Sequence, residues 1–214
     1  MISFSNWFAF FIAAWIIALS PGSGAVLSMA HGLNYGVKRA SATILGLQLG
    51  LLLILAIAGA GVGSILMASA MAFMSVKFLG AVYLIYLGLQ QWRARGGLAM
   101  GGLPGRDQIP TVRHRIATGF LTNATNPKGI LFMIAVFPQF IDSARPLPGQ
   151  LAILAITMTC IDLCVMHGYA FAAASLQRYL NSPVWVRRQN QFFGGLLMMM
   201  GAGLFFMKQG SKAA

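Results

Sequence analysis

Two residues of opposite charge, Asp162 and Lys128, lie deep inside apolar stretches of this sequence. Asp162 is in the middle of a long hydrophobic run, and Lys128 directly follows a proline in another run. A charged side chain at the centre of a membrane helix costs about 2.5 to 3.5 kcal/mol, so such residues are functional candidates. Asp162 has the chemistry to exchange a proton or hold an ammonium group, and Lys128 to hold a carboxylate. The alternative is a permanent structural ion pair between them.

Helix breakers interrupt two of the apolar runs at corresponding positions. The first break is Ser20-Pro21-Gly22, and the second is Asn126-Pro127-Lys128. Proline removes a backbone donor and glycine permits unusual dihedral angles, so both breaks free carbonyl or amide groups. In a membrane, such groups are tolerated only where they face protein or a wet cavity. The alternative is that each proline merely kinks its helix.

Paired breaks of this kind predict a binding site, because transporters use the exposed ends of half-helices to bind substrate carboxylates or coupling ions. We expect Asp162 to be the proton-coupling residue. The expected substrate-binding residues are Pro21, Gly22, Ser23, Asn126, Pro127 and Lys128.

The elements that position these residues are predicted to be membrane helices. The 214 residues are 58% hydrophobic and only 8% charged, with a mean hydropathy of +0.76, whereas soluble domains carry about 25% charged residues. Apolar runs long enough to span a bilayer cover residues 8–30, 41–63, 68–91, 116–140, 149–174 and 190–208. We therefore predict an all-α integral membrane protein with six transmembrane helices in one domain, residues 1–214.

A Gly- and Arg-rich connector, residues 92–115, divides the six spans into two groups of three. Because three is odd, the two groups enter the membrane from opposite sides. Residues 1–91 and 116–214 are thus predicted to form two inverted three-helix repeats, with the first and fourth helices broken at Pro21 and Pro127.

The basic residues lie between the apolar runs, which is a membrane-topology pattern and not a nucleic-acid surface. With the N-terminus outside, ten of the fifteen Lys and Arg residues fall in cytoplasmic loops and three fall outside, while Lys77 and Lys128 lie within spans. This asymmetry predicts a multi-pass protein with both termini outside.

Metal, cofactor and enzymatic chemistry find little support in the sequence. Heavy-metal efflux through Cys160, Asp162 and Cys164 is one alternative, although no histidine stands at ligand spacing. A membrane thiol-redox conduit needs a cysteine in each half, and the first half has none. No nucleophile and base arrangement suggests an enzyme, and we expect no metal or cofactor.

Several motifs resemble those of the LysE/RhtB family of bacterial amino-acid exporters, and the similarity runs nearly end to end. The most specific stretch is residues 126–132, Asn-Pro-Lys-Gly-Ile-Leu-Phe, which leads to Phe-Pro-Gln-Phe at 137–140. Further similar segments are Ser20-Pro21-Gly22, the glycines at 32 and 36, the glycines at 46 and 50, residues 77–84 with Gly88, and Asp162 followed by Gly168-Tyr169.

The resemblance implies proton-driven efflux of amino acids or their derivatives across the bacterial inner membrane, with a homodimer as one form of assembly. Two features depart from the family pattern. Ser23-Gly24 replaces the usual Pro-Asn, and the segment from Gly46 to Leu51 lacks an aspartate after its second glycine. Without that acid, proton coupling is expected to depend more heavily on Asp162.

Overall fold

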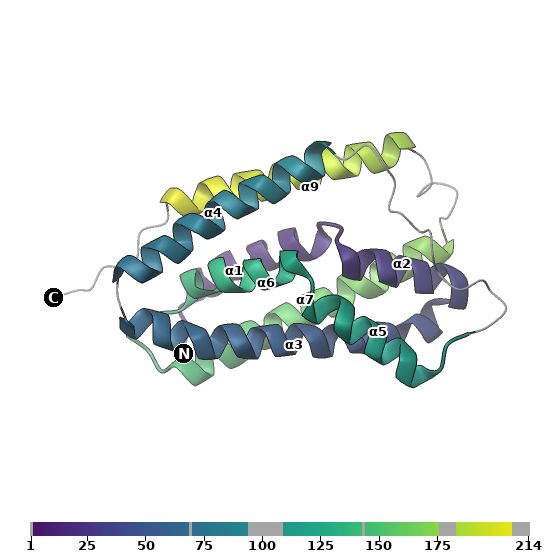
Figure 1. Cartoon of the computed structure of the whole chain (residues 1–214), viewed down its shortest axis with the longest axis horizontal. Coiled ribbons are helices and arrows are strands. Elements are labelled where there is room, and N and C mark those ends of the chain that lie inside the picture. The colour runs from purple at the N-terminus through teal and green to yellow at the C-terminus, as the bar shows by residue number, and fades with distance from the viewer. Residues whose placement is uncertain (1, 69, 94–108, 143, 176–182, 207–214) are drawn as a thin grey trace.

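The computed structural model describes residues 2–68, 70–93, 109–142, 144–175 and 183–206, and every element over these residues is helical. The helices lie along the long axis of the molecule (Figure 1). Most of the predicted connector, residues 94–108, lies outside the described residues. The elements are α1 (Phe4–Leu19), α2 (Ser23–Tyr35), α3 (Val37–Ala68), α4 (Ala70–Arg93), α5 (Val112–Ala124), α6 (Pro127–Ala135), η1 (Phe137–Phe140), α7 (Leu147–Ser175) and α9 (Pro183–Phe206).

The first helix break lies where the sequence predicts it. Helix α1 ends at Leu19, α2 begins at Ser23, and the two helices are bent by 56°. Pro21 has no N–H group, so the carbonyl of Ile17 loses the partner that it would have in a continuous helix. A second carbonyl at this end of α1, that of Leu19, accepts a hydrogen bond of 2.6 Å from the Tyr169 hydroxyl of α7.

The second break is built differently. Helix α5 ends in a tightened turn in which the amide of Asn126 donates to the carbonyl of Asn123 at 3.0 Å. Pro127 then occupies the first turn of α6, where its missing N–H costs nothing. The Asn126 side chain caps α6 by accepting from the amide of Lys128 at 3.1 Å.

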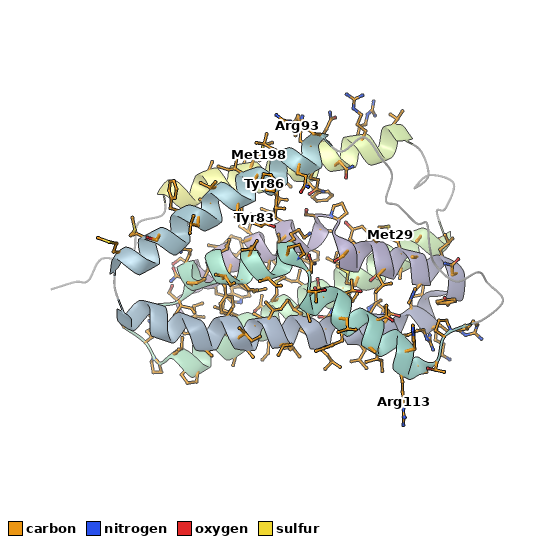
Figure 2. The ribbon with its side chains drawn as sticks, in the orientation of Figure 1. Met29, Tyr83, Tyr86, Arg93, Arg113 and Met198 are labelled. Atoms are coloured by element: carbon orange, nitrogen blue, oxygen red, sulfur yellow. The ribbon has the colours of Figure 1, made fainter. Side chains whose placement is uncertain are left out.

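Each broken helix packs against an unbroken helix from the other half of the chain. Helices α1 and α2 contact α7, while α5 and α6 contact α3. Helices α4 and α9 pack mainly against each other and form a separate layer along one side (Figure 1). Tyr83, Tyr86 and Met198 belong to this layer, and Arg113 at the start of α5 points away from the helices (Figure 2).

Glycines allow helices α3 and α5 to approach unusually closely. A Cβ atom added to Gly46 would lie 2.0 Å from the carbonyl oxygen of Ile116, and one added to Gly119 would lie 2.1 Å from that of Thr43. Backbone atoms cannot yield as a flexible side chain can. The contact between α3 and α5 therefore requires glycine at these positions.

Two of the described helices are long and apolar enough to cross a membrane, namely α3 over Val37–Gly61 and α7. The bent pair of α1 and α2 makes a third if it counts as one span. Fewer helices meet this test than the six spans predicted from the sequence. Six spans in two inverted repeats stay a prediction, whereas the all-helical class is confirmed.

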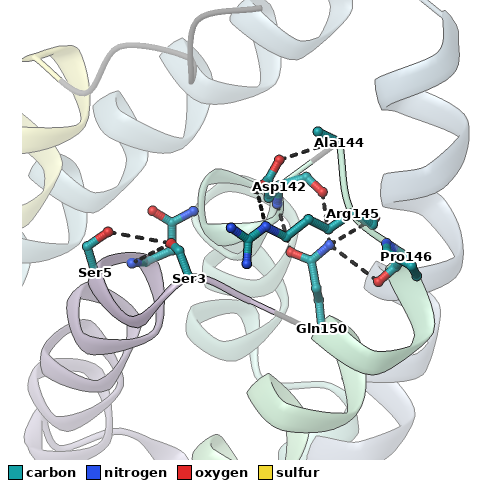
Figure 3. Close-up of polar contacts among 8 residues, drawn as sticks. Ser3, Ser5, Asp142, Ala144, Arg145, Pro146 and Gln150 are labelled. Carbon is teal, nitrogen blue, oxygen red and sulfur yellow. Dashed lines mark hydrogen bonds and ion pairs between the residues drawn. The ribbon is translucent and has the colours of Figure 1, made fainter. Parts of the chain in front are cut away.

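A buried amide organises the loop before α7. Gln150 is fully buried, accepts from the amide of Asp142 at 2.8 Å and donates to the carbonyls of Asp142 and Arg145 (Figure 3). Asp142 also forms an ion pair of 3.0 Å with Arg145. The loop is thus tied to α7 by the side chain of one residue.

We expect Gly119→Ala to lower the Tm of the detergent-purified protein by about 5 °C, because the new methyl group must separate α3 from α5. Gly168→Ala in α7 is the matched control, since nothing lies within 4 Å of a Cβ atom there. The control should leave Tm unchanged or raise it slightly. Equal losses in both variants would contradict the close-contact interpretation.

The cap on Leu19 is also testable. Tyr169→Phe should lower Tm by about 3 °C, because it leaves the partly buried carbonyl of Leu19 without its hydrogen bond. Tyr86→Phe on α4 is the control, since its side chain is 56% exposed. A Tyr169→Phe protein as stable as this control would show that the hydroxyl contributes nothing to the break.

Candidate functional site

The two breaks meet around a small internal cavity of about 40 Å³. Helices α1, α2, α3, α6 and α7 and the end of α5 line it, and much of its surface is apolar. This volume admits water but is far below the several hundred Å³ of a typical ligand pocket. The lining residues with polar side chains are Ser20, Asn123, Asn126, Lys128 and Asp162.

Lys128 connects the two breaks. It lies in the first turn of α6, and its Nζ donates to the carbonyl of Ile17 at 3.1 Å and to the carbonyl of Ser20. Both acceptors lie at the C-terminal end of α1, where unpaired carbonyls give the helix a negative end. The Lys128 ammonium therefore occupies backbone acceptors that the first break has freed.

Asp162 lies on α7 and is 8% exposed. Its Oδ2 accepts a hydrogen bond of 2.7 Å from Nε2 of Gln48 on α3. The Oε1 atom of Gln48 is buried and has no hydrogen-bond partner among the described residues. A buried carboxyl group thus faces an amide that retains one unused acceptor.

Lys128 and Asp162 do not form a direct ion pair, since the partners of their charged groups are the carbonyls of α1 and the amide of Gln48. Both groups line the same cavity, but each bonds to a neutral partner. The structural ion pair considered from the sequence is therefore not formed in this structure. The cavity wall thus carries one carboxyl group and one amino group that do not bond to each other.

The N-terminus of α2 offers a second polar surface. Its N-cap residue is Gly22, which supplies no side-chain hydrogen bond to the first turn. Gly22, Gly24 and Ala25 line the cavity. Uncapped amides at a helix N-terminus attract anionic groups, so this turn can accept a carboxylate.

The structure brings only some of the predicted residues to the cavity. Gly22, Asn126, Lys128 and Asp162 line it. Pro21 and Pro127 are not among the lining residues and act through the backbone they interrupt. Ser23 is exposed and does not line the cavity.

Two amide residues at the site, Asn123 and Gln48, are not among the site residues predicted from the sequence. Asn123 lines the cavity and also donates to the carbonyl of Leu47 at 2.7 Å, so it joins α5 to α3. Gln48 contacts Asp162 directly. Amide residues on apolar helices near the breaks could have suggested a place in the site. The sequence alone does not show which faces of α3 and α5 point to the cavity.

The cysteines lie away from the cavity. Cys160 and Cys164 are free and exposed, whereas Asp162 between them is buried. Residues two apart on a helix point in different directions, so this trio does not converge on a metal ion. No cluster of three or more potential metal-ligating His, Cys, Asp or Glu residues occurs in the described part of the chain.

Comparison with known proteins agrees with a membrane transport role. The family model of the LysE type translocator matches residues 15–209. A homoserine/homoserine lactone efflux protein of Salmonella typhi is 38% identical over 94% of this chain and 96% of its own length. A leucine efflux protein of an Enterobacter species is 30% identical over 91% of this chain and 92% of its own.

An uncharacterised membrane protein of Vibrio cholerae is 40% identical over 92% of this chain and 94% of its own length. No solved structure matches the chain at a significant level. The match to the family model covers most of the sequence, including both helix breaks and Asp162. The chain therefore belongs to the LysE type translocator family, whose members are membrane transporters and not enzymes.

Proposed function

We propose that this protein exports amino acids or their derivatives from the bacterial cytoplasm by secondary active transport in exchange for protons. The observation that carries the proposal is the cavity at the meeting point of the two helix breaks, with Lys128 and Asp162 on its wall. A zwitterion needs one anionic and one cationic contact, and this cavity offers both. Binding at half-helix ends is the arrangement that transporters use for such substrates.

The names of the relatives favour particular substrates. Homoserine and homoserine lactone share an amino group, but only homoserine has a free carboxylate. We assign the ammonium to Asp162, because this contact serves both solutes. The amides of the first turn of α2, together with Lys128, then receive the carboxylate or the lactone carbonyl. Leucine, the solute named for a second relative, also presents both charges.

The cavity must enlarge before it can hold such a solute, because its present volume is about 40 Å³. The substrate therefore requires a wider form of this cavity than the one in this structure. Alternating access requires the broken helices to move relative to α3 and α7, against which they pack. The polar groups at the breaks would then face the cytoplasm and the exterior in turn.

The packing supports one domain, residues 1–214, made of six spans in two inverted repeats. Helices α1 and α2 pack on α7 as α5 and α6 pack on α3, and α4 packs on α9. Such packing of each half on a helix of the other half is expected if residues 1–91 and 116–214 are related by a two-fold axis in the membrane plane. We place the protein in the inner membrane with both termini outside, and a homodimer is one form of assembly to test.

Proton coupling is assigned to Asp162. The ionised carboxylate of Asp162 attracts the ammonium group of the substrate, whereas the neutral carboxyl group attracts it only weakly. Proton uptake from the exterior would thus favour substrate release, and proton loss to the cytoplasm would favour substrate binding. Net exchange of one solute for protons follows from this alternation.

The direct test is efflux of labelled homoserine, Thr, Leu, Lys and Cys from preloaded cells with and without this protein. We expect export of homoserine that depends on the protein and is abolished by a proton uncoupler. Export that persists with the uncoupler would refute proton coupling but not amino-acid transport. No export of any amino acid would refute the proposed substrate class and favour efflux of metal ions or other solutes.

Asp162→Asn should abolish uncoupler-sensitive efflux while the protein still reaches the membrane in normal amounts. The reason is that an amide cannot exchange a proton, although it can keep a hydrogen bond to Gln48. Asp142→Asn is the matched control, because Asp142 lies in the loop before α7 and pairs with Arg145. Normal coupled efflux in the Asp162→Asn protein would exclude this residue as the coupling group.

A further inference from the structure

The C-terminal end of α1 is a concentration of backbone acceptors inside the bundle. The Tyr169 hydroxyl binds the carbonyl of Leu19, and one ammonium group binds those of Ile17 and Ser20. The Ile17 carbonyl lost its helical partner to Pro21, which has no N–H. Such a cluster of carbonyls at the negative end of a helix has the chemistry of a cation site.

The cation bound to this cluster is the ammonium of Lys128, whose backbone lies where a positive charge is electrostatically unfavourable. Lys128 lies at the N-terminus of α6, where the helix dipole disfavours positive charge. Its side chain extends away from that end to α1. A Cβ atom added to Gly22 would lie 3.1 Å from Lys128 Cε and 3.2 Å from Nζ, so glycine at this position leaves room for the side chain.

We propose that the end of α1 is a monovalent-cation site and that the Lys128 ammonium is a tethered cation filling it. In transporters with broken helices, unwound carbonyls and half-helix C-termini coordinate a coupling ion. Here a side chain from the second break supplies that charge and holds the two breaks together. The site itself rests on the contacts of Lys128; only its place in a transport cycle rests on the proposed function.

The surroundings of Lys128 favour a tethered cation over an ion pair. Asp162 is the other ionisable residue lining the cavity, and it bonds to Gln48. Among the described residues, every acceptor of the ammonium is a backbone carbonyl. A site of this kind recognises a small monovalent cation that donates hydrogen bonds, and the protein itself then needs no metal ion there.

Removing the side chain should create an empty site that an external ammonium ion can refill. Lys128→Ala deletes the three methylenes beyond Cβ and the Nζ atom, which is the structure of propylammonium. We expect the purified variant to lose roughly 5 °C in Tm. Propylammonium chloride should recover at least half of that loss, while tetrapropylammonium chloride at the same concentration, which has no N–H donor, should not.

Lys128→Met is the matched control, because its side chain occupies much of the same space without the charge. Its Tm should fall as well, but propylammonium should not restore it. Asp162→Asn is a second control, since its cation site stays filled by Lys128. No selective recovery in Lys128→Ala, or equal recovery in all three variants, would overturn the proposal.

The wild-type protein provides the test if Lys128→Ala does not fold. Because the site is already filled, replacing choline chloride with NaCl or KCl should not change its Tm selectively, and a selective rise would overturn the proposal. These stability measurements do not require transport. Failure of the proposed function would appear as absent efflux by the wild type, and failure of this inference as an absent or unselective Tm response.

Discussion

The constraint on which this structure depends is the need to satisfy backbone polar groups where helices break inside an apolar bundle. An unpaired carbonyl in such surroundings costs several kcal/mol. At the first break, Tyr169 and Lys128 meet this need by reaching in from α7 and α6. Three segments far apart in sequence are thereby held at one point, and the cavity forms beside it.

The two breaks solve the same problem in different ways. The second is satisfied locally, because Asn126 caps α6 and Pro127 needs no acceptor. The first relies on distant side chains and leaves the N-terminus of α2 without a side-chain cap. The first break therefore presents more backbone polar groups than the second. It places the negative end of α1 and the positive end of α2 only a few residues apart.

Close packing beside the cavity brings two helices into backbone contact. Helices α3 and α5 touch through their backbones at Gly46 and Gly119, so no side chain or water separates them there. Helices α4 and α9 form a layer of their own, and none of their described side chains lines the cavity. The direct α3–α5 contact thus lies beside a cavity whose lining combines apolar side chains with a few polar ones.

The sequence by itself determined the helical class, the positions of both breaks, and the placement of Lys128 and Asp162 within apolar runs. These follow from local chemistry: hydrophobic runs require helices, proline removes a donor, and a charge within an apolar run stands out. The glycine motifs and the Asn-Pro-Lys stretch also indicated the family, which the comparison confirmed. No tertiary information was needed for any of these.

Only the tertiary structure decided which groups meet. The sequence allowed Lys128 to pair with Asp162, but the side chain reaches the carbonyls of α1 while Asp162 bonds to Gln48. It also included Ser23 in the site, although that residue is exposed. Such choices depend on helix rotation and on distances between segments more than a hundred residues apart, and local sequence periodicity contains neither.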